Sequence, residues 1–216
     1  ELTDHIDKSQ PTVIPQGAMI GKRIKFGFVT DNHLCSKYER LDVLIALYQR
    51  FKEDGVTTVY NAGNVIDGEA RFNKFDIHTY GVENQCNYFA NMYPQIKGID
   101  TYFITGDDHE GWYVQREGIN IGKFMEQKAR EHGRTDLHYL GHMEHDVILK
   151  APKGQAVMRI VHPGGGSSYA ISYTSQKLVE SYSPGEKPQV LLMGHYHKMA
   201  FDFIRGVYVI QGGTTM

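Results

Sequence analysis

The strongest constraint on the fold is an alternation of short strand-like runs with segments of helical periodicity between residues 24 and 132. Alternating apolar residues predict a strand that ends at Thr30-Asp31, and apolar residues at helical spacing predict a helix over 41–51 that stops at Gly55. Further strands are predicted at 57–60 and 101–105, and further helices around 88–93 and over 119–132. Strand–helix–strand units of this kind favour an α/β fold with a partly parallel sheet.

The second half of the chain is richer in strands. Strands are predicted at 145–150, 156–162, 190–193, 200–204 and 207–210, with one helix over 169–182. We find neither an internal repeat nor a linker between two halves, so one domain with two sheets between helices is expected. Residues 1–22 are rich in Pro and Gly without a hydrophobic period, which predicts a leader arm or linker. The domain itself is expected over 23–216, and it could be truncated at its C-terminus.

Composition excludes several classes of protein. A length of 216 residues with 41% hydrophobic and 22% charged residues suits a buried core and not a disordered chain. A formal net charge of −2 argues against attachment to nucleic acid or membrane by bulk positive charge, although a local basic patch is compatible with it. Cys35 and Cys86 form no paired motif, which favours a reducing compartment. Without an apolar run of roughly 20 residues or a signal-peptide pattern, we expect a cytoplasmic protein with no membrane partner.

Several of the 11 histidines lie in polar motifs that directly follow predicted strands. These motifs are Asp31-Asn32-His33, Gly63-Asn64, Asp107-Asp108-His109-Glu110, His162-Pro163 and Gly194-His195-Tyr196-His197. Because ligands bind beyond the carboxyl ends of strands in open α/β sheets, five such ends would gather these groups at one rim. Oxygen and imidazole donors without thiolate suit Mn, Fe, Zn or Mg. Each motif alone is compatible with an ordinary turn, whereas their ordered combination predicts a metal site.

In this order the motifs resemble the signature of the calcineurin-like metallophosphoesterases. That signature reads D-x-H, G-D-x-x-D-G, G-N-H-D/E, a lone His and G-H-x-H, each after a strand. The second block corresponds here to Gly63-Asn64-Val65-Ile66-Asp67-Gly68, and the resemblance spans about residues 24–213. The run 162–170 is similar to phage and prokaryotic phosphoesterases of unassigned substrate. The resemblance implies a four-layer αββα sandwich of two mixed sheets flanked by helices.

The resemblance also implies a dinuclear metal centre with position 64 as the bridge. One divalent ion would be held by Asp31, His33 and His197. The other would be held by Asp108, His162 and His195. The expected metal is Mn²⁺, with Fe, Zn, Ni or Mg as alternatives. Members of the family act as two-metal clamps on the phosphoryl oxygens and use a metal-bound hydroxide as the nucleophile.

Catalytic roles follow from the same resemblance. Asp108 and His109 would be the catalytic residues of the third motif, with His109 as the general acid that protonates the leaving alkoxide. Asp67 and Glu110 would orient imidazole ligands, although ordinary turn carboxylates are an open alternative for both. The implied reaction is metal-dependent hydrolysis of phosphate esters, foremost phosphodiesters of nucleotide or nucleic-acid type.

Two positions depart from the family pattern. Asn64 stands where the family has a bridging aspartate, and Asp108 stands where it has an asparagine. Because an amide oxygen is neutral and the amide NH₂ only donates, Asn64 should bridge two cations poorly. The change is either a natural exchange between the two positions or an introduced Asp-to-Asn change, and the intact surrounding block favours the second. The alternative function is therefore a catalytically weak or inactive binding or scaffold subunit.

Substrate contacts are expected from the segment that follows the second motif. Arg71 and Lys74 could neutralise a phosphate or a nucleic-acid backbone. Phe72 or Phe75 could stack on a base. A solvated loop with packed aromatics is the alternative.

Two further contacts are expected closer to the other motifs. Trp112 could form a pocket wall just beyond the third motif. Gly165 lies in a glycine-rich run before a predicted helix, where backbone amides could hold an anion near His162. That glycine run could equally serve only the turn.

Overall fold

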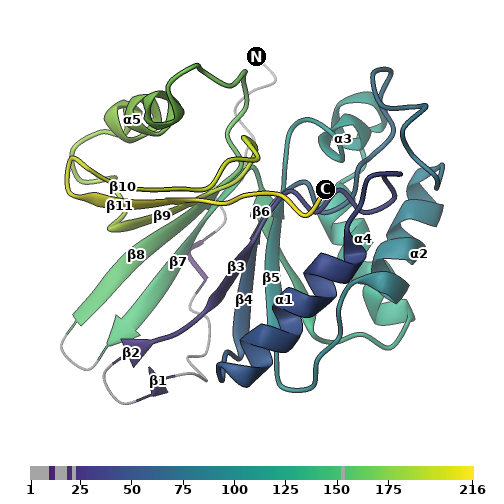
Figure 1. The fold of residues 1–216 in the computed structure, drawn as a ribbon, viewed down its shortest axis with the longest axis horizontal. Helices are drawn as coiled ribbons and strands as arrows, with labels where there is room; N and C mark the ends of the chain where they lie inside the picture. The colour runs from purple at the N-terminus through teal and green to yellow at the C-terminus, as the bar shows by residue number, and fades with distance from the viewer. Residues whose placement is uncertain (1–9, 13–18, 21–22, 152–153) are drawn as a thin grey trace.

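The computed structural model describes residues 10–12, 19–20, 23–151 and 154–216. Helices, a four-stranded sheet, a five-stranded sheet and a last helix form successive layers (Figure 1). This arrangement confirms the predicted α/β sandwich of two sheets flanked by helices, but only the five-stranded sheet is mixed, so the prediction of two mixed sheets is wrong for the four-stranded one. Within the described residues, none of the helices has the length and apolar character needed to cross a membrane.

The four-stranded sheet is parallel throughout and has the order β3-β4-β5-β6. Its strands are β3 (Gly27–Val29), β4 (Thr58–Ala62), β5 (Asp100–Thr105) and β6 (Leu137–His142). The connecting helices are α1 (Leu41–Glu53), α2 (Val82–Met92), the short α3 (Gly111–Glu117) and α4 (Ile121–Glu131). Apolar side chains from α1, α2 and α4 bury a core against the sheet, with Leu44, Phe89 and Met125 at its centre. Because every connection crosses over, the carboxyl ends of all four strands meet at one edge.

The five-stranded sheet is mixed and has the order β10-β11-β9-β8-β7. Its strands are β7 (Glu144–Ala151), β8 (Gly154–Val161), β9 (Val190–Met193), β10 (Ala200–Ile204) and β11 (Val207–Gln211). Strand β8 is parallel to β9, which is parallel to β11, while β7 and β10 run antiparallel at the two edges. Helix α5 (Ile171–Ser181) covers the outer face through Val179.

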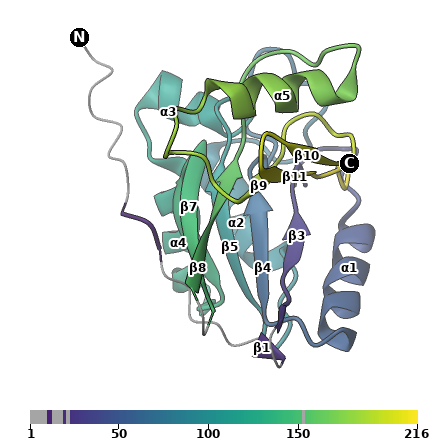
Figure 2. The same ribbon diagram turned by 90° about the vertical axis from the view of Figure 1, so that its left-hand side faces the viewer.

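The two sheets pack face to face through a second apolar core that includes Ile104, Ile160 and Leu192. In the turned view of Figure 2, β3, β4 and β8 run side by side toward the same end of the molecule, where α5 also lies. The loops that follow these strands therefore share one rim, although they belong to different sheets.

Three differences from the predicted elements have local causes. Strand β6 was not predicted, because two histidines and a glycine interrupt its apolar pattern. Helix α3 is too short to show a period. The predicted helix 119–132 begins at Ile121, since the side chain of Asn120 accepts a hydrogen bond from the Lys123 amide and caps it.

The predicted leader arm lies mostly outside the described residues. Of its described part, β1 (Met19–Ile20) pairs with β2 (Arg23–Ile24). Thr12 pairs with β7: its amide donates to the Asp146 carbonyl at 3.1 Å, and its carbonyl accepts from the Ile148 amide at 3.3 Å. Thr12 thus adds a single bridge at the edge of the five-stranded sheet, whereas β1 and β2 form a separate two-stranded sheet.

Candidate metal centre

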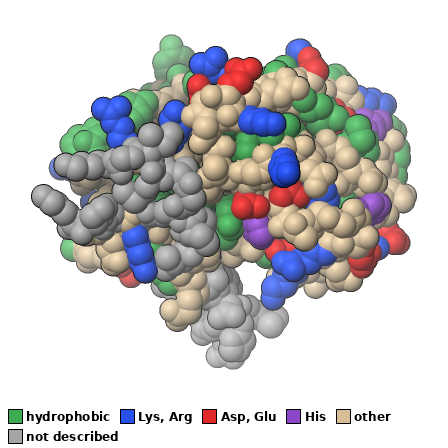
Figure 3. Space-filling view, turned by 90° about the horizontal axis from the view of Figure 1, so that it is seen from below, with side chains coloured by type: hydrophobic (Ala, Val, Ile, Leu, Met, Phe, Trp, Pro, Cys, Tyr) green, Lys and Arg blue, Asp and Glu red, His purple; other side chains and the backbone are tan. Residues whose placement is uncertain are grey.

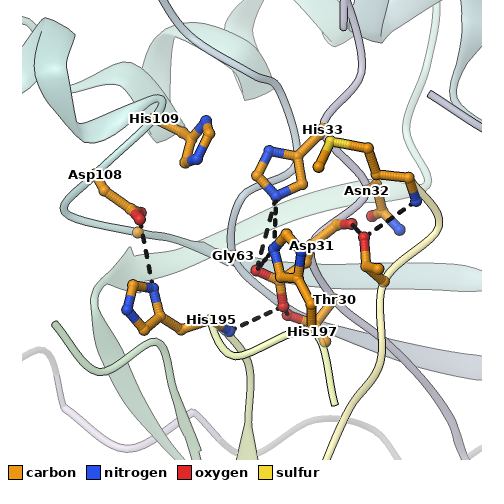
Figure 4. Close-up of polar contacts among 12 residues, drawn as sticks. Thr30, Asp31, Asn32, His33, Gly63, Asp108, His109, His195 and His197 are labelled. Carbon is orange, nitrogen blue, oxygen red and sulfur yellow. Dashed lines mark hydrogen bonds and ion pairs between the residues drawn. The ribbon is translucent and has the colours of Figure 1, made fainter. Parts of the chain in front are cut away.

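The polar motifs converge where the carboxyl ends of strands from both sheets meet. Three groups of potential ligand atoms form there, and within each group the atoms lie within 4.8 Å of one another. One of them, His33 with Asp67 and His109, lies wholly in loops that follow strands of the four-stranded sheet, and the other two draw on both sheets. Of these two, the first group is Asp31, His33 and His197, and the second is Asp108, His162 and His195. Each of the two combines residues that follow strands of the four-stranded sheet with residues that follow β8 or β9 of the other sheet (Figure 4). The structure therefore brings together the two sets expected from the sequence, whose role as metal ligands stays a prediction.

In the first group, one carboxylate oxygen faces two imidazoles. Asp31 Oδ1 lies 3.4 Å from His197 Nε2 and 3.9 Å from His33 Nε2, and the two imidazole nitrogens are 3.1 Å apart. The other oxygen, Oδ2, accepts hydrogen bonds from the Thr30 hydroxyl at 2.7 Å and the His195 amide at 2.9 Å. These two bonds fix the carboxylate so that Oδ1 points toward the imidazoles.

The second group has both carboxylate oxygens directed at imidazoles. Asp108 Oδ1 lies 3.4 Å from His162 Nε2, and Asp108 Oδ2 lies 3.4 Å from His195 Nδ1. On their outer sides, His162 Nδ1 donates to the Ala62 carbonyl and His195 Nε2 donates to the Gly165 carbonyl, both at 2.6 Å. Because a carbonyl only accepts, each outer nitrogen carries a proton, and each inner nitrogen of the neutral ring presents a lone pair.

The residues present fit a divalent metal ion. Five buried ligand atoms at the rim have no hydrogen-bond partner among the described residues: Asp31 Oδ1, Asn64 Oδ1, Asp108 Oδ1, His162 Nε2 and His195 Nδ1. Buried polar atoms are almost always paired, so five unpaired ones in a single region point to a missing partner. That partner must accept lone pairs from oxygen and imidazole nitrogen, as Mn, Fe or Zn ions do.

Asn64 connects the two groups. Its backbone carbonyl accepts a hydrogen bond from the His33 amide at 2.9 Å, which places it beside the first group. Its side-chain oxygen is directed toward the second group, because a methyl group built on Gly106 would contact both Asn64 Oδ1 at 2.6 Å and His162 Nε2 at 2.9 Å. The neutral oxygen of Asn64 thus lies beside the second group, and its role as a bridge between two ions stays a prediction.

Asp67 links an imidazole of the first group to His109. Its Oδ1 lies 2.9 Å from both His33 Nδ1 and His109 Nδ1, while Asn73 Nδ2 donates to Oδ2 at 3.0 Å. Although burial alone would raise the pKa of Asp67, the hydrogen bonds from both histidines lower it to about 2. With Nδ1 donating to Asp67, His33 directs the lone pair of Nε2 at Asp31 and His197. Asp67 therefore contacts the His33 imidazole, and its role in orienting a metal ligand stays a prediction.

The pKa values of the other imidazoles follow from burial and neighbouring carboxylates. Burial lowers the pKa of His33, which favours the neutral form that binds metals. Burial would also lower the pKa of His109, but the hydrogen bond to Asp67 and the charges of nearby carboxylates together raise that pKa. Burial would likewise lower the pKa of His162, but Asp108, Asp31 and Glu110 together raise it to about 9. Despite its burial, the pKa of Asp108 is lowered by the neighbouring imidazoles of His162 and His195.

Glu110 is fully buried, and its Oε1 accepts a hydrogen bond from the Gly106 amide at 3.0 Å. Burial raises the pKa of Glu110 to about 7. Its hydrogen bond thus supports the loop after β5, and the orientation of an imidazole by Glu110 stays a prediction.

Strained backbone marks the site independently of any motif. Nine non-glycine residues of the described chain have positive φ, and six of them belong to the site. The six are Asp31, His33, Asn64, His109, His195 and His197, with φ between 25° and 83°. Because L-residues adopt this region at a cost of order 1–3 kcal/mol each, such strain gathers where function requires a particular geometry.

The last residues of the chain hold the Asp31 loop in place, a contact that sequence reasoning missed. Thr214 Oγ1 and the Thr215 amide both donate to the Asp31 carbonyl, at 2.7 and 3.3 Å. Asn32 Nδ2 donates to Thr215 Oγ1 at 3.1 Å, and the Arg40 amide donates to the Thr215 carbonyl at 2.8 Å. This segment follows β11 of the five-stranded sheet, so it ties that sheet to the first loop of the other.

The four predicted substrate contacts occupy accessible positions around the rim. Arg71 and Lys74 are exposed on a turn between β4 and α2, and the Lys74 amine lies 4.7 Å from the centre of the Phe75 ring. Trp112, in α3, is also exposed. Gly165 contacts the site through its carbonyl, which accepts from His195, and anion binding by its amide stays a prediction.

Comparisons with known proteins find similarity only among solved structures. No protein-family model matches the chain, and no curated protein matches it. A novel archaeal phosphodiesterase is 14% identical, with 88% of this chain and 83% of that chain covered at a TM-score of 0.48. A hypothetical protein from Pyrococcus horikoshii is 13% identical, with 88% and 76% covered at a TM-score of 0.48. Vps29 from Entamoeba histolytica, complexed with Zn²⁺, is 12% identical, with 87% and 72% covered at a TM-score of 0.36.

Proposed function

We propose that the protein hydrolyses phosphodiesters at a centre of two divalent metal ions, with Mn²⁺ as the first candidate. The observation that carries this proposal is the set of five buried ligand atoms without hydrogen-bond partners. Four of the five atoms belong to two groups, each of one carboxylate and two imidazoles, and each group draws on loops of both sheets. The fifth atom is the side-chain oxygen of Asn64. Two ions bound there would supply Lewis-acid polarisation of the phosphoryl oxygens and acidify a water molecule.

In this proposal the chain's own residues fix the charge and the orientation of the centre. Asp31 and Asp108 contribute two negative charges, and their positions are set by the hydrogen bonds and imidazole contacts described above. The outer nitrogens of His162 and His195 donate to backbone carbonyls, which prevents the rings from rotating.

His109 is the proposed general acid. Its Nδ1 donates to Asp67, and its raised pKa keeps the ring protonated closer to neutral pH. The Nε2 proton of the charged ring is then free to pass to the leaving oxygen. His109 also lies against the ring of His33, with centroids 4.3 Å apart, so it is adjacent to the first ligand group.

Substrate recognition is proposed to depend on a few residues near the site and not on a large positively charged surface. The face drawn in Figure 3 shows Lys and Arg interspersed with Asp and Glu and no field of one sign, in keeping with the net charge of −2. Arg71, Lys74, Trp112 and the Gly165 amide are the proposed contacts for a phosphodiester of nucleotide or nucleic-acid type.

The test combines metal analysis with turnover. Protein prepared with Mn²⁺ is expected to hold two ions and to hydrolyse bis(p-nitrophenyl) phosphate. The double variant Asp31→Ala, Asp108→Ala should remain folded, hold no metal and show no turnover. Wild-type protein that is folded but holds no metal and shows no turnover would refute the proposal.

His109→Ala separates chemistry from metal binding. The variant is expected to keep its metal content and lose about 10²–10⁴-fold in kcat, the usual contribution of a general acid. The loss should shrink for substrates with good leaving groups, because these need no protonation. Equal loss for poor and good leaving groups would mean that His109 only positions the phosphate.

A binding or scaffold subunit is the second candidate, and the neutral oxygen of Asn64 between the two groups favours it. Under this alternative, metal would bind without measurable turnover of any phosphodiester. Against it stand the retained imidazoles and His109, together with the strained backbone that holds them.

A further inference from the structure

An exposed aromatic ring lies directly against the proposed general acid. Phe72 is 59% exposed, and its ring meets that of His109 edge to face, with centroids 5.2 Å apart and an interplanar angle of 85°. His109 thus sits between His33 on the metal side and Phe72 on the solvent side. The leaving group of a phosphodiester would take its proton from His109, so it would lie next to Phe72.

The turn that carries Phe72 is held rigidly. The neighbouring Asn73 is buried, and its side chain accepts from the Ala70 amide at 2.8 Å. The same side chain donates to the Asp67 carbonyl at 2.8 Å and to its carboxylate at 3.0 Å. Since Asp67 also holds His109, Phe72 and the acid share one support. A ring fixed in this way loses little conformational freedom when a ligand stacks on it.

Phe75, the other aromatic residue of this turn, is placed differently. Its ring lies beneath the amine of Lys74, at 4.7 Å. The contact with His109 therefore distinguishes Phe72 from Phe75. Arg71 precedes Phe72, Lys74 follows two residues later, and both are exposed, so the same turn carries two cationic groups.

We propose that Phe72 stacks on the nucleobase of the leaving nucleoside, which makes it a specificity-determining residue for nucleic-acid-type phosphodiesters. This inference rests on the proposed function. In the reaction, the oxygen of a water molecule bonds to phosphorus, the ester P–O bond breaks, and the leaving oxygen takes a proton from His109, which gives a phosphomonoester and a nucleoside. The proton that the water loses passes to solvent, and His109 regains one from solvent. A flat base has a π-face that an aromatic ring recognises without sequence preference, and an exposed cation on the same turn suits a neighbouring phosphate.

The experiment uses the Mn²⁺-loaded full chain and three substrates. These are the dinucleotide thymidylyl-thymidine and two analogues, each of which lacks one of the two bases but keeps its sugar. The leaving alcohols then have nearly the same acidity, so only the stacking contact changes. We expect kcat/KM to fall about 5- to 150-fold when the leaving nucleoside lacks its base, the range for one base–aromatic contact. Loss of the other base should have a smaller effect.

Variants assign this preference to the ring. Phe72→Leu should lower kcat/KM for the dinucleotide by the same factor. For the analogue without the leaving base, kcat/KM of this variant should stay within twofold of the wild-type value. Phe72→Trp should retain the wild-type preference for the dinucleotide. Phe203→Leu is the matched control, because Phe203 is 62% exposed on β10 and its ring lies against Tyr208, with centroids 4.7 Å apart, and not against a site residue. This control should keep the wild-type preference.

Three results would overturn the inference while the proposed function stands. The first is turnover of bis(p-nitrophenyl) phosphate but of none of the dinucleotides. The second is equal kcat/KM of the wild-type enzyme for the three substrates. The third is an equal loss of kcat/KM for all three substrates in Phe72→Leu. Absence of turnover with every phosphodiester, in folded and metal-loaded protein, would instead refute the proposed function.

Discussion

Replacing Asn64 by aspartate tests how charge is distributed in the candidate centre. Asn64 is 1% exposed, and its side-chain oxygen has no hydrogen-bond partner. In metal-free protein, Asn64→Asp adds a buried carboxylate to a site that already holds the carboxylates of Asp31, Asp67, Asp108 and Glu110, so we expect a loss of stability of about 1–3 kcal/mol. With Mn²⁺ bound, the same charge faces cations, and the sign of the effect should reverse.

The gain with metal can be bounded from Coulomb's law. A carboxylate about 4 Å from a divalent ion gains roughly 8 kcal/mol at an effective dielectric constant of about 20. Desolvation of the buried carboxylate costs several kcal/mol and offsets much of this gain. We therefore expect metal affinity and kcat/KM to rise at least about tenfold, or about 1.4 kcal/mol, with the ion on the Asp31 side gaining most occupancy.

The assay is urea-induced unfolding with EDTA and with saturating Mn²⁺, together with metal titration and turnover. Asn61→Asp is the matched control, because Asn61 is equally buried but donates to Asn32 and Tyr93 rather than facing the ligand groups. This control should destabilise the protein in both conditions. If Asn64→Asp leaves metal affinity and activity unchanged or lower, the reasoning fails, and the exchange with Asp108 is a natural arrangement.

Three further outcomes are expected. Gly106→Ala should weaken metal binding at least about tenfold, measured by calorimetric titration. The added methyl group would lie 2.6 Å from Asn64 Oδ1 and 2.7 Å from the His162 ring. Gly166→Ala should leave metal binding unchanged, because a methyl group added there meets open space. Metal-free protein should lose stability on the order of 2 kcal/mol as pH rises from about 6.5 to 9, measured by denaturant titration. The raised pKa of His162 stabilises the fold only while the ring stays protonated. A flat stability profile over that pH range would contradict this prediction. Thr214→Val should cost about 1 kcal/mol in urea unfolding and reduce metal affinity, since it removes the bond to the Asp31 carbonyl, whereas Thr214→Ser should behave as wild type.

The sequence was most informative where a short run has one clear period. Alternating apolar residues located β3, helical spacing located α1, and the polar residues after the strands predicted which side chains would meet. The reason is physical, since parallel strands with crossover helices must place their carboxyl ends at one edge. Strand β6 escaped prediction because its half-buried pattern lacks alternation.

The supporting contacts of the site could not be predicted from the sequence. Thr30, Asn73 and Thr214 each fix a site residue through a hydrogen bond, and Thr214 does so across a long stretch of chain. A lone Thr or Asn in a turn carries no periodic signal, and its partner depends on tertiary packing. For the same reason the sequence named Phe72 and Phe75 together, and only the contact with His109 separates them.

The division of both ligand groups between the two sheets has a consequence for biosynthesis. The chain is made from its N-terminus, so Asp31, His33 and Asp108 leave the ribosome well before His195 and His197. Neither group is complete until the loop after β9 has been made and the sheets have docked. A nascent chain therefore offers only isolated carboxylates and imidazoles to cellular metal ions, and full coordination at either group requires that β9 already lies in place beside β8.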